Sequence, residues 1–380
     1  MKNILNTLLF ALFFTSFVQA QEVFDYTYEG QTLKYQITSE KEAKVAREGR
    51  INVIDIVKIP EEVVFRNKKY KVTNIGDAVF WECKNLSSII IPNSVTSIGR
   101  SAFGGCESLD NVEIPKSVTS IGGSAFSECK SLTNIVIPNS VTSIGDNAFG
   151  SCGKLKKIVL PNSVTRIDDH AFSYCRDLTN IVIPNSVTSI GRGAFASCKS
   201  LNDIVIPNSV TTIGKAAFGN AGLIKVEIPS SVTSIDDAAF NSCEALEKIE
   251  VASDNKFYSS IDEVLFNKAK DTLVSFPGSR DSYVIPGTVT HIGNSAFAIC
   301  EKLKGVEIPS SVTSIGREAF AGCFNLESVT IKAETPPSVD ERVFLNCSIE
   351  KIHVPAGSVK KYKNADGWSE YKDVIKAIGK

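Results

Sequence analysis

Cysteine is the residue type in this chain with the most obvious chemical capacity, because a thiolate can ligate a metal, form a disulfide or attack an electrophile. The ten cysteines share one repeating register: Cys83, Cys106, Cys129, Cys152, Cys175, Cys198, Cys243, Cys300, Cys323 and Cys347. In the repeat that lacks cysteine, Ala221 occupies the position. One small residue per repeat favours a buried apolar side chain. Disulfides and metal ligation remain alternatives.

Histidines and paired acids are too scattered for a catalytic site. The three histidines are His170, His291 and His353, in three distant repeats. The acid pairs 168–169 and 236–237 recur at a turn position, where such residues are common. The chain contains no nucleophile elbow, phosphate loop or zinc motif. We therefore expect no enzymatic activity, no cofactor and no metal site.

The cysteines belong to a longer phrase, Leu-x-x-Ile-x-Ile-Pro, Val-Thr-Ser-Ile-Gly, Ala-Phe-x-x-Cys, which returns about every 23 residues. Its phenylalanines are Phe80, Phe103, Phe126, Phe149, Phe172, Phe195, Phe218, Phe240, Phe297, Phe320 and Phe344. A period of this length with this aliphatic spacing is typical of a leucine-rich-repeat solenoid. One repeat buries too little apolar surface to fold alone, so neighbouring coils must cover both of its faces.

Each part of the phrase predicts a part of one coil. The Ile-x-Ile alternation predicts a short parallel strand, which the following proline ends. In the next run, glycines such as Gly99, Gly122 and Gly145 are expected to turn the corner at positive φ. Ala-Phe-x-x-Cys predicts a short helical or 3-10 turn on the convex side of a curved right-handed coil. There we expect neighbouring coils to lie further apart than paired strands, which disfavours disulfides between them.

The phrase resembles the repeat of the BspA-like bacterial surface proteins, whose unit is the Treponema-type leucine-rich repeat. The resemblance covers about residues 70–347. It implies a secreted or cell-surface binding protein, associated with adhesion to host or matrix molecules, and it implies no catalysis. It carries over no binding residues, because the motif is that of the scaffold.

The first 20 residues predict export. Lys2 is followed by an apolar stretch and the small-residue end Val18-Gln19-Ala20, which is typical of a Sec signal peptide cleaved before Gln21. A short membrane anchor is the alternative. No second apolar run is long enough to span a bilayer, so we expect no integral span after cleavage. With 41 basic and 42 acidic residues, the chain lacks the positive excess of a nucleic-acid binder.

The predicted organisation has four parts. A signal peptide at 1–20 precedes an N-terminal β-rich cap at 21–70, and the leucine-rich-repeat array occupies 71–347. Because 34 residues separate Val251 from Ile285, a β-hairpin is expected near 255–280, where it stiffens the array or creates a local site. Trp368, Tyr371, Ile375 and Ile378 recur at helical spacing and predict a C-terminal helical cap at 348–380.

The residues that recognise a partner must lie at positions where the repeats differ in sequence. The strand residue between the two core aliphatics points away from the core, onto the concave sheet. The predicted binding residues at this position are Ile90, Val136, Val159, Val182, Val205, Glu227, Glu250 and Glu307. The four valines form an apolar stripe about 15 Å long, followed by glutamates beside Lys225 and Lys248. A stripe rimmed by polar groups points to a partner, although valine is also simply a good strand former.

The sequence therefore predicts a non-catalytic binding protein that recognises an extracellular protein or glycan through the concave face of the solenoid. We expect a monomer that is exported to the cell surface, the periplasm or the medium. The alternative is a structural or self-assembling cell-envelope protein.

Overall fold

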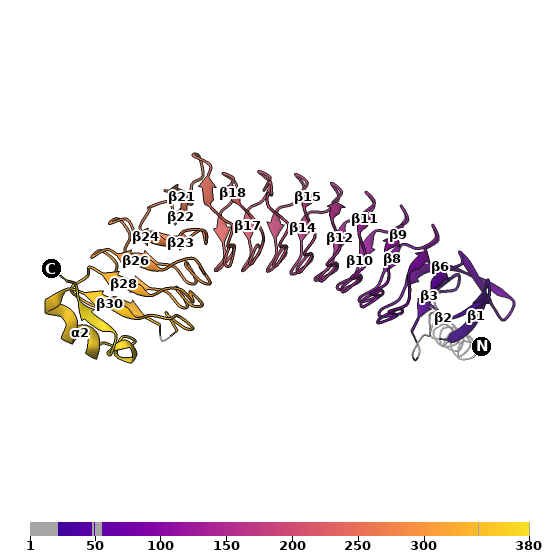
Figure 1. Ribbon diagram of the computed structural model, residues 1–380. Coiled ribbons are helices and arrows are strands. Elements are labelled where there is room, and N and C mark those ends of the chain that lie inside the picture. The colour runs from indigo at the N-terminus through magenta and orange to yellow at the C-terminus, as the bar shows by residue number, and fades with distance from the viewer. Residues whose placement is uncertain (1–21, 48, 50–54, 341, 380) are drawn as a thin grey trace, which may run out of the picture. The chain divides into compact units, whose positions relative to one another are not determined.

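The computed structural model describes residues 22–47, 49, 55–340 and 342–379 (Figure 1). The expected signal peptide and its cleavage site lie outside these residues. The chain divides into two compact units, one up to Arg176 and one from Asp177 onward. Each unit is built from stacked coils with parallel strands, as the period predicts. In the described ranges, no helix is long and apolar enough to cross a lipid bilayer.

Five strands open the first unit: β1 (Val23–Tyr28), β2 (Gln31–Ile37), β3 (Glu42–Ala46), β5 (Glu62–Phe65) and β6 (Lys68–Ile75). The pairs β1–β2, β2–β3 and β5–β6 are antiparallel, whereas β3 pairs with β6 in parallel. The β5–β6 hairpin turns through Arg66 and Asn67, both at positive φ, as a tight two-residue hairpin loop requires.

The Ile-x-Ile segments form the first ladder of the unit. Its strands are β4 (Ile56–Lys58), β7 (Ser88–Ile90), β9 (Asn111–Val112), β11 (Asn134–Val136) and β13 (Lys157–Val159). The strand β7 pairs in parallel with both β4 and β9, and β11 pairs with β13. A single bridge joins Glu113 to Val136. Because β4 belongs to this ladder, the repeat pattern begins at Val57 and Pro60, before the expected start of the array.

A second ladder forms where the sequence predicts only a corner. Its strands are β8 (Ser97–Ile98), β10 (Ser120–Ile121), β12 (Ser143–Ile144) and β14 (Arg166–Ile167). The strands β8, β10 and β12 continue in parallel from β6. The expectation of one strand per repeat is therefore wrong, because the Ser-Ile pair of each coil hydrogen-bonds to its neighbours.

The Ala-Phe-x-x-Cys segments are hydrogen-bonded turns and not helices. Ser124 and Glu128 lie at φ values of 56° and 58°, which interrupt any helical run. Neighbouring turns also bond to each other, since Phe103 N–H donates to Ala125 O at 2.8 Å and Gly105 N–H donates to Ser127 O at 2.7 Å. The predicted wide separation of coils on this side is therefore wrong.

Phenylalanine rings form a continuous column inside the first unit. The centroids of Phe103 and Phe126 are 5.2 Å apart, and those of Phe126 and Phe149 are 5.4 Å apart, with nearly parallel rings. The cysteines lie beside this column, and Cys129 Sγ donates a hydrogen bond of 3.3 Å to Phe103 O in the preceding coil. Nine of the ten cysteines are buried. Burial raises the pKa of Cys152 to about 12.

The repeated glycine that follows each Ser-Ile pair does not serve a positive φ. Among the described residues, the glycines at positive φ are Gly30, Gly49, Gly105, Gly193, Gly322 and Gly367. A side chain is excluded at Gly122 and Gly145 by close packing instead. A Cβ at Gly145 would lie 2.5 Å from Gly123 N, and one at Gly122 would lie 2.7 Å from Arg100 N.

Replacing Gly145 by alanine should lower the free energy of unfolding by about 1–3 kcal/mol, because the backbone of the preceding coil must move to admit the methyl group. Gly153→Ala is the matched control, since its Cβ would meet no atom within 4 Å. Urea unfolding of both variants measures the difference. If the two variants had equal urea midpoints, the coils at Gly145 would be able to admit a methyl group without loss of stability.

The second unit repeats the first-ladder strand in most of its coils. These strands are β15 (Asn180–Val182), β18 (Lys225–Ile228), β20 (Lys248–Val251), β24 (Ser282–Val284), β26 (Gly305–Ile308), β28 (Ser328–Ile331) and β30 (Lys351–Val354). The second ladder contains β16 (Ser189–Ile190), β17 (Thr212–Ile213), β19 (Ser234–Ile235), β25 (His291–Ile292), β27 (Ser314–Ile315) and β29 (Ser338–Val339).

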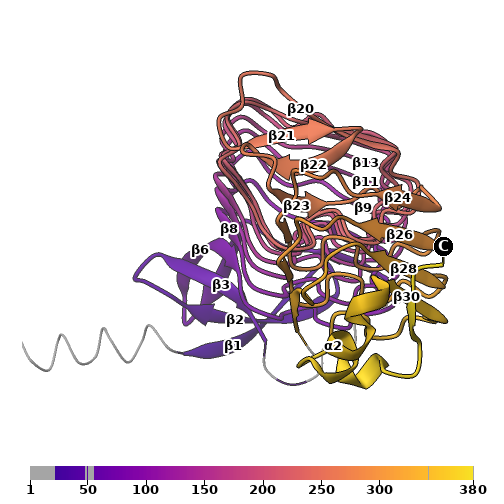
Figure 2. The same cartoon turned by 90° about the vertical axis from the view of Figure 1, so that its left-hand side faces the viewer.

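The segment that breaks the period folds as three strands: β21 (Tyr258–Ile261), β22 (Val264–Asn267) and β23 (Thr272–Ser275). Each is antiparallel to the next (Figure 2). The strand β23 also pairs in parallel with β25. Buried Asn255 precedes them. Its Nδ2 donates to Pro229 O at 2.8 Å and Val232 O at 3.1 Å, while its Oδ1 accepts from the N–H groups of Phe257 and Tyr258. This side chain joins the three strands to the preceding coil.

The C-terminal segment is only partly helical. It contains the 3-10 turns η1 (Ala356–Ser358) and η2 (Ser369–Tyr371), the helix α2 (Val359–Asn364) and the strand β31 (Ile375–Ala377). The predicted helix through Ile375 and Ile378 is wrong, because β31 pairs in parallel with β30 and satisfies the edge of the last ladder. Trp368 is fully buried, and its Nε1 donates to Pro337 O at 2.8 Å.

Candidate binding surface

The strand face is the outward surface of the first ladder, and one residue per coil points onto it. This residue lies two positions before the repeat proline, between two buried aliphatic residues, as Val136 lies between Ile135 and Ile137. Parallel pairing in register places such residues side by side. Val136 is opposite Val159 in the first unit, and Glu227 is opposite Glu250 in the second.

In the first unit, the predicted residues Ile90, Val136 and Val159 are all exposed aliphatic side chains, with Val136 exposed to 73%. Glu113 lies between the coils of Ile90 and Val136 and is also exposed. The unit therefore presents exposed aliphatic side chains on this face, each held in place by a hydrogen-bonded strand.

In the second unit, the structure brings four predicted residues together. Val182, Val205, Glu227 and Glu250 line one groove, with a volume of about 1230 Å³. Val205 is exposed to 76% of its surface. Glu307 lies outside the groove, where it is half-buried and forms an ion pair of 3.4 Å with Lys332. The sequence thus predicted the outward strand position, but it did not distinguish the residues that line the groove from Glu307, which lies outside it.

Polar residues complete the groove on both sides of these four side chains. Asn180, Asp203 and Lys225 precede the buried aliphatic residue in each coil, and Asp254 follows the strand of Glu250. The lining contains four carboxylates and a single lysine, and none of its residues is aromatic. The groove is therefore apolar along part of its length and acidic along the rest.

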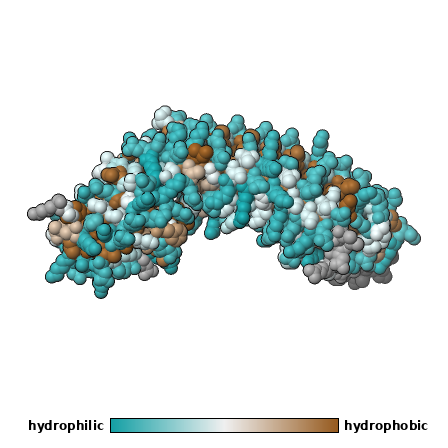
Figure 3. Space-filling view, viewed as in Figure 1, coloured by the Kyte–Doolittle hydropathy of each residue, from teal (hydrophilic) through white to brown (hydrophobic). Residues whose placement is uncertain are grey.

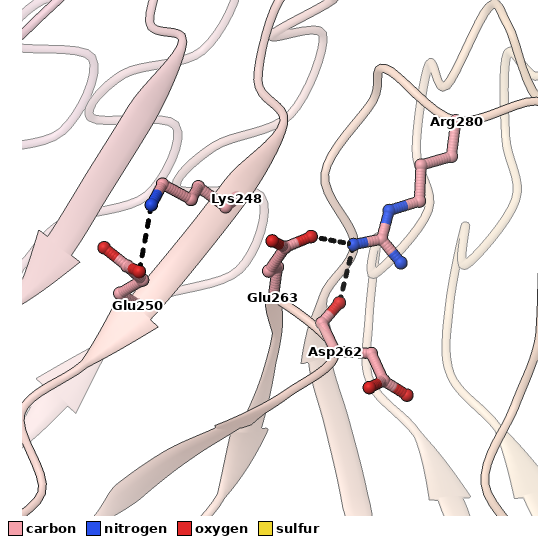
Figure 4. A network of polar contacts seen from close by, with 5 residues as sticks. All are labelled: Lys248, Glu250, Asp262, Glu263 and Arg280. Carbon is pink, nitrogen blue, oxygen red and sulfur yellow. Dashed lines mark hydrogen bonds and ion pairs between the residues drawn. The ribbon is translucent and has the colours of Figure 1, made fainter.

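One of the carboxylates has a partner within its own strand. Lys248 Nζ lies 3.0 Å from Glu250 Oε1, and this hydrogen bond raises the pKa of Lys248. Figure 4 shows this pair beside a second network, in which Arg280 bonds to the carboxylate of Glu263 and to Asp262 O. Both contacts are partly exposed, so they are worth little stability and mainly fix the orientation of the side chains.

The ladder is interrupted beneath the groove. Residues 203–206 form no strand, although their sequence follows the repeat phrase, and Ile204 and Ile206 are buried as in other coils. The interruption coincides with a repeat of 22 residues from Leu201 to Leu223. The shorter turn brings the chain so close that a Cβ at Gly222 would lie 2.1 Å from Lys199 O.

The sequence prediction missed two residues of the strand face. Lys58 lies on β4 and forms an ion pair of 2.5 Å with Glu29, and Val284 lies on β24 opposite Glu307, exposed to 67%. Both stand two positions before a proline, Pro60 and Pro286. Counting back from every proline would therefore have found them.

The structure gives the histidines no shared site. His170 and His291 are exposed on separate coils, and His353 is half-buried on β30. Within the described part of the chain, no group of three or more histidine, cysteine or acidic residues could hold a metal ion. Figure 3 shows hydrophilic residues over most of the face in view, with hydrophobic residues scattered among them.

Comparison with known proteins identifies the repeat. A family model described as a BspA type leucine rich repeat region, with six copies, matches residues 61–179, 165–283 and 278–365. No curated protein matches the chain.

Solved structures agree with this match. The crystal structure of a leucine rich cell surface protein from Faecalibacterium prausnitzii A2-165 is similar, with 28% identity and a TM-score of 0.63, covering 95% of this chain and 96% of that one. A leucine-rich repeat protein from Bacteroides ovatus ATCC 8483 is 26% identical with a TM-score of 0.58, covering 94% and 99%. The predicted leucine-rich-repeat solenoid is thereby confirmed.

Proposed function

The chain belongs to the BspA-type leucine-rich repeat family, and we propose that it is an exported, non-catalytic protein of the cell surface that binds an extracellular partner through its strand face. The similar protein from Faecalibacterium prausnitzii is described as a cell surface protein. The apolar leader of this chain supports export by the Sec route. Adhesion to a host or matrix molecule is the corresponding biological role.

The groove of the second unit is the observation that carries this proposal. Val182 and Val205 expose apolar side chains there beside Glu227 and Glu250. Exposed aliphatic residues rimmed by polar groups are typical of protein interaction sites. Because strands hold the flanking coils, little conformational entropy is lost when a partner binds.

The absence of catalysis is part of the proposal. The described histidines are dispersed, and the groove residues lack a nucleophile paired with a base. Buried cysteines such as Cys152 have raised pKa values and stay protonated at neutral pH. Binding alone uses the features that the surface presents.

The test is a binding assay with purified protein on arrays of extracellular matrix proteins and glycans. The double variant Val182→Glu/Val205→Glu should weaken binding to the captured partner about tenfold or more, because it places two charges at an apolar contact. Val284→Glu is the matched control, since Val284 has the same strand position outside the groove. Equal loss in both variants, or none in either, would contradict the proposed site.

A structural role is the competing function. If copies of the chain packed against each other through their exposed valines, the scattering mass would rise with protein concentration. A binding protein keeps the mass of the monomer. Light scattering of the mature protein over a hundredfold concentration range distinguishes the two.

A further inference from the structure

We infer that the groove of the second unit binds an extended peptide segment of a partner protein, with small aliphatic residues at one end and basic residues at the other. The inference rests on the proposed function, because it names the class of partner for the same surface. Two independent features carry it: the order of side chains along the groove and the charge of the groove.

The order of side chains gives the groove two chemically different ends. Val182 and Val205 come from successive coils, and Glu227 and Glu250 come from the next two. At about 4.8 Å between strands, four coils extend over about 15 Å, the length of four or five residues of an extended chain. A partner that fits must therefore change from apolar to charged within a few residues.

The negative charge of the groove requires the charged residues of the partner to be positive. Four carboxylates line it, from Asp203, Glu227, Glu250 and Asp254, against Lys225 alone. In the described chain, only Glu250 of these four forms an ion pair, with Lys248. Three carboxylates are therefore free for lysine or arginine side chains, and an acidic segment would be repelled.

A glycan fits this groove less well than a peptide. None of the lining residues is aromatic, so the groove has no flat apolar surface for stacking a sugar ring. The aliphatic side chains of Val182 and Val205 suit small aliphatic side chains instead. The carboxylates can bond to sugar hydroxyls, but these contacts leave their charge without a counter-ion.

The test uses the mature chain and two synthetic octapeptides. The basic peptide has valine at positions one and three, lysine at positions five and seven, and serine elsewhere, and the acidic peptide has glutamate in place of lysine. Fluorescence anisotropy should show the basic peptide binding at least tenfold more tightly than the acidic one. Its affinity should fall as sodium chloride rises from about 50 to about 500 mM, because salt screens exposed charges.

Variants assign the binding to the groove. The triple variant Asp203→Asn/Glu227→Gln/Glu250→Gln should bind the basic peptide about tenfold more weakly. The matched control is Glu113→Gln/Glu307→Gln, which removes two glutamates of the strand face outside the groove and should leave the affinity unchanged. Circular dichroism checks that both variants remain folded.

The outcomes separate this inference from the proposed function. If the two peptides bind equally, or the triple variant and the control behave alike, the peptide inference is overturned. If a glycan binds and Val182→Glu/Val205→Glu abolishes that binding, the proposed function stands and the peptide inference fails. If the groove variants alter the binding of no array component and of neither peptide, both are wrong.

Discussion

The variant Phe126→Ala should lose about 3–5 kcal/mol of unfolding free energy, the range for a buried aromatic ring cut back to a methyl group. Phe126 is fully buried, and its ring stacks between Phe103 and Phe149. The cavity therefore removes contacts on both sides of the coil. Neighbouring coils cannot collapse into it, because backbone hydrogen bonds fix their separation at the turns.

Tyr174→Ala provides the control for this change. Tyr174 lies on the same side of a coil in the same unit, but its side chain is 51% exposed. Its loss should cost less than about 1 kcal/mol. Urea unfolding followed by circular dichroism measures both variants, and hydrogen exchange locates the destabilised coils. A loss below about 1 kcal/mol for Phe126→Ala would show that the column adds little to stability.

Asn255→Ala should destabilise the second unit by about 3–4 kcal/mol, because it leaves two buried carbonyl groups and two part-buried N–H groups without their hydrogen-bond partner. The side chain of Asn255 donates to Pro229 O and Val232 O and accepts from the N–H groups of Phe257 and Tyr258. Its residue is completely buried. Water cannot easily replace the two bonds to the buried carbonyl groups.

A second substitution separates the two halves of this network. Asn255→Asp keeps an acceptor for the two N–H groups but places a carboxylate against two carbonyl oxygens. It should therefore also destabilise the unit, increasingly so as the pH rises above the pKa of the new acid. Asn180→Ala is the control, because Asn180 is exposed on the strand face. Thermal unfolding at pH 4 and pH 8 measures the three variants. Equal stability of Asn255→Ala and Asn180→Ala would contradict the assigned role.

The repeat phrase was sufficient to predict the solenoid and its first ladder. A proline after every Ile-x-Ile segment identified which residue points outward, and Val136 and Val205 are indeed exposed. The second ladder was missed because its strands, such as Ser120–Ile121, are two residues long. A segment so short has no alternation to recognise. Its pairing depends on the neighbouring coils.

The remaining prediction errors arise where the same residue pattern is compatible with two different structures. Glycine at Gly145 is required by a close approach of the preceding backbone, which a sequence cannot distinguish from a need for positive φ. Helical spacing at Trp368 and Ile375 was overridden by the pairing of β31 with β30. The interruption at residues 203–206 could not be predicted from their letters, which match those of intact coils, and only the 22-residue spacing gave a sign of it.

The row of cysteines affects how the protein is inactivated by oxidation over time. A thiol whose pKa is about 12, such as that of Cys152, is almost wholly protonated at neutral pH and is inert to oxidants while the coil is intact. Once a coil opens, neighbouring thiols become reactive together, and an oxidising medium can link them before refolding. In an oxidising medium, transient opening would then leave permanent disulfide cross-links between coils. The functional lifetime of the protein would be governed by the rate at which coils open and not by its equilibrium stability.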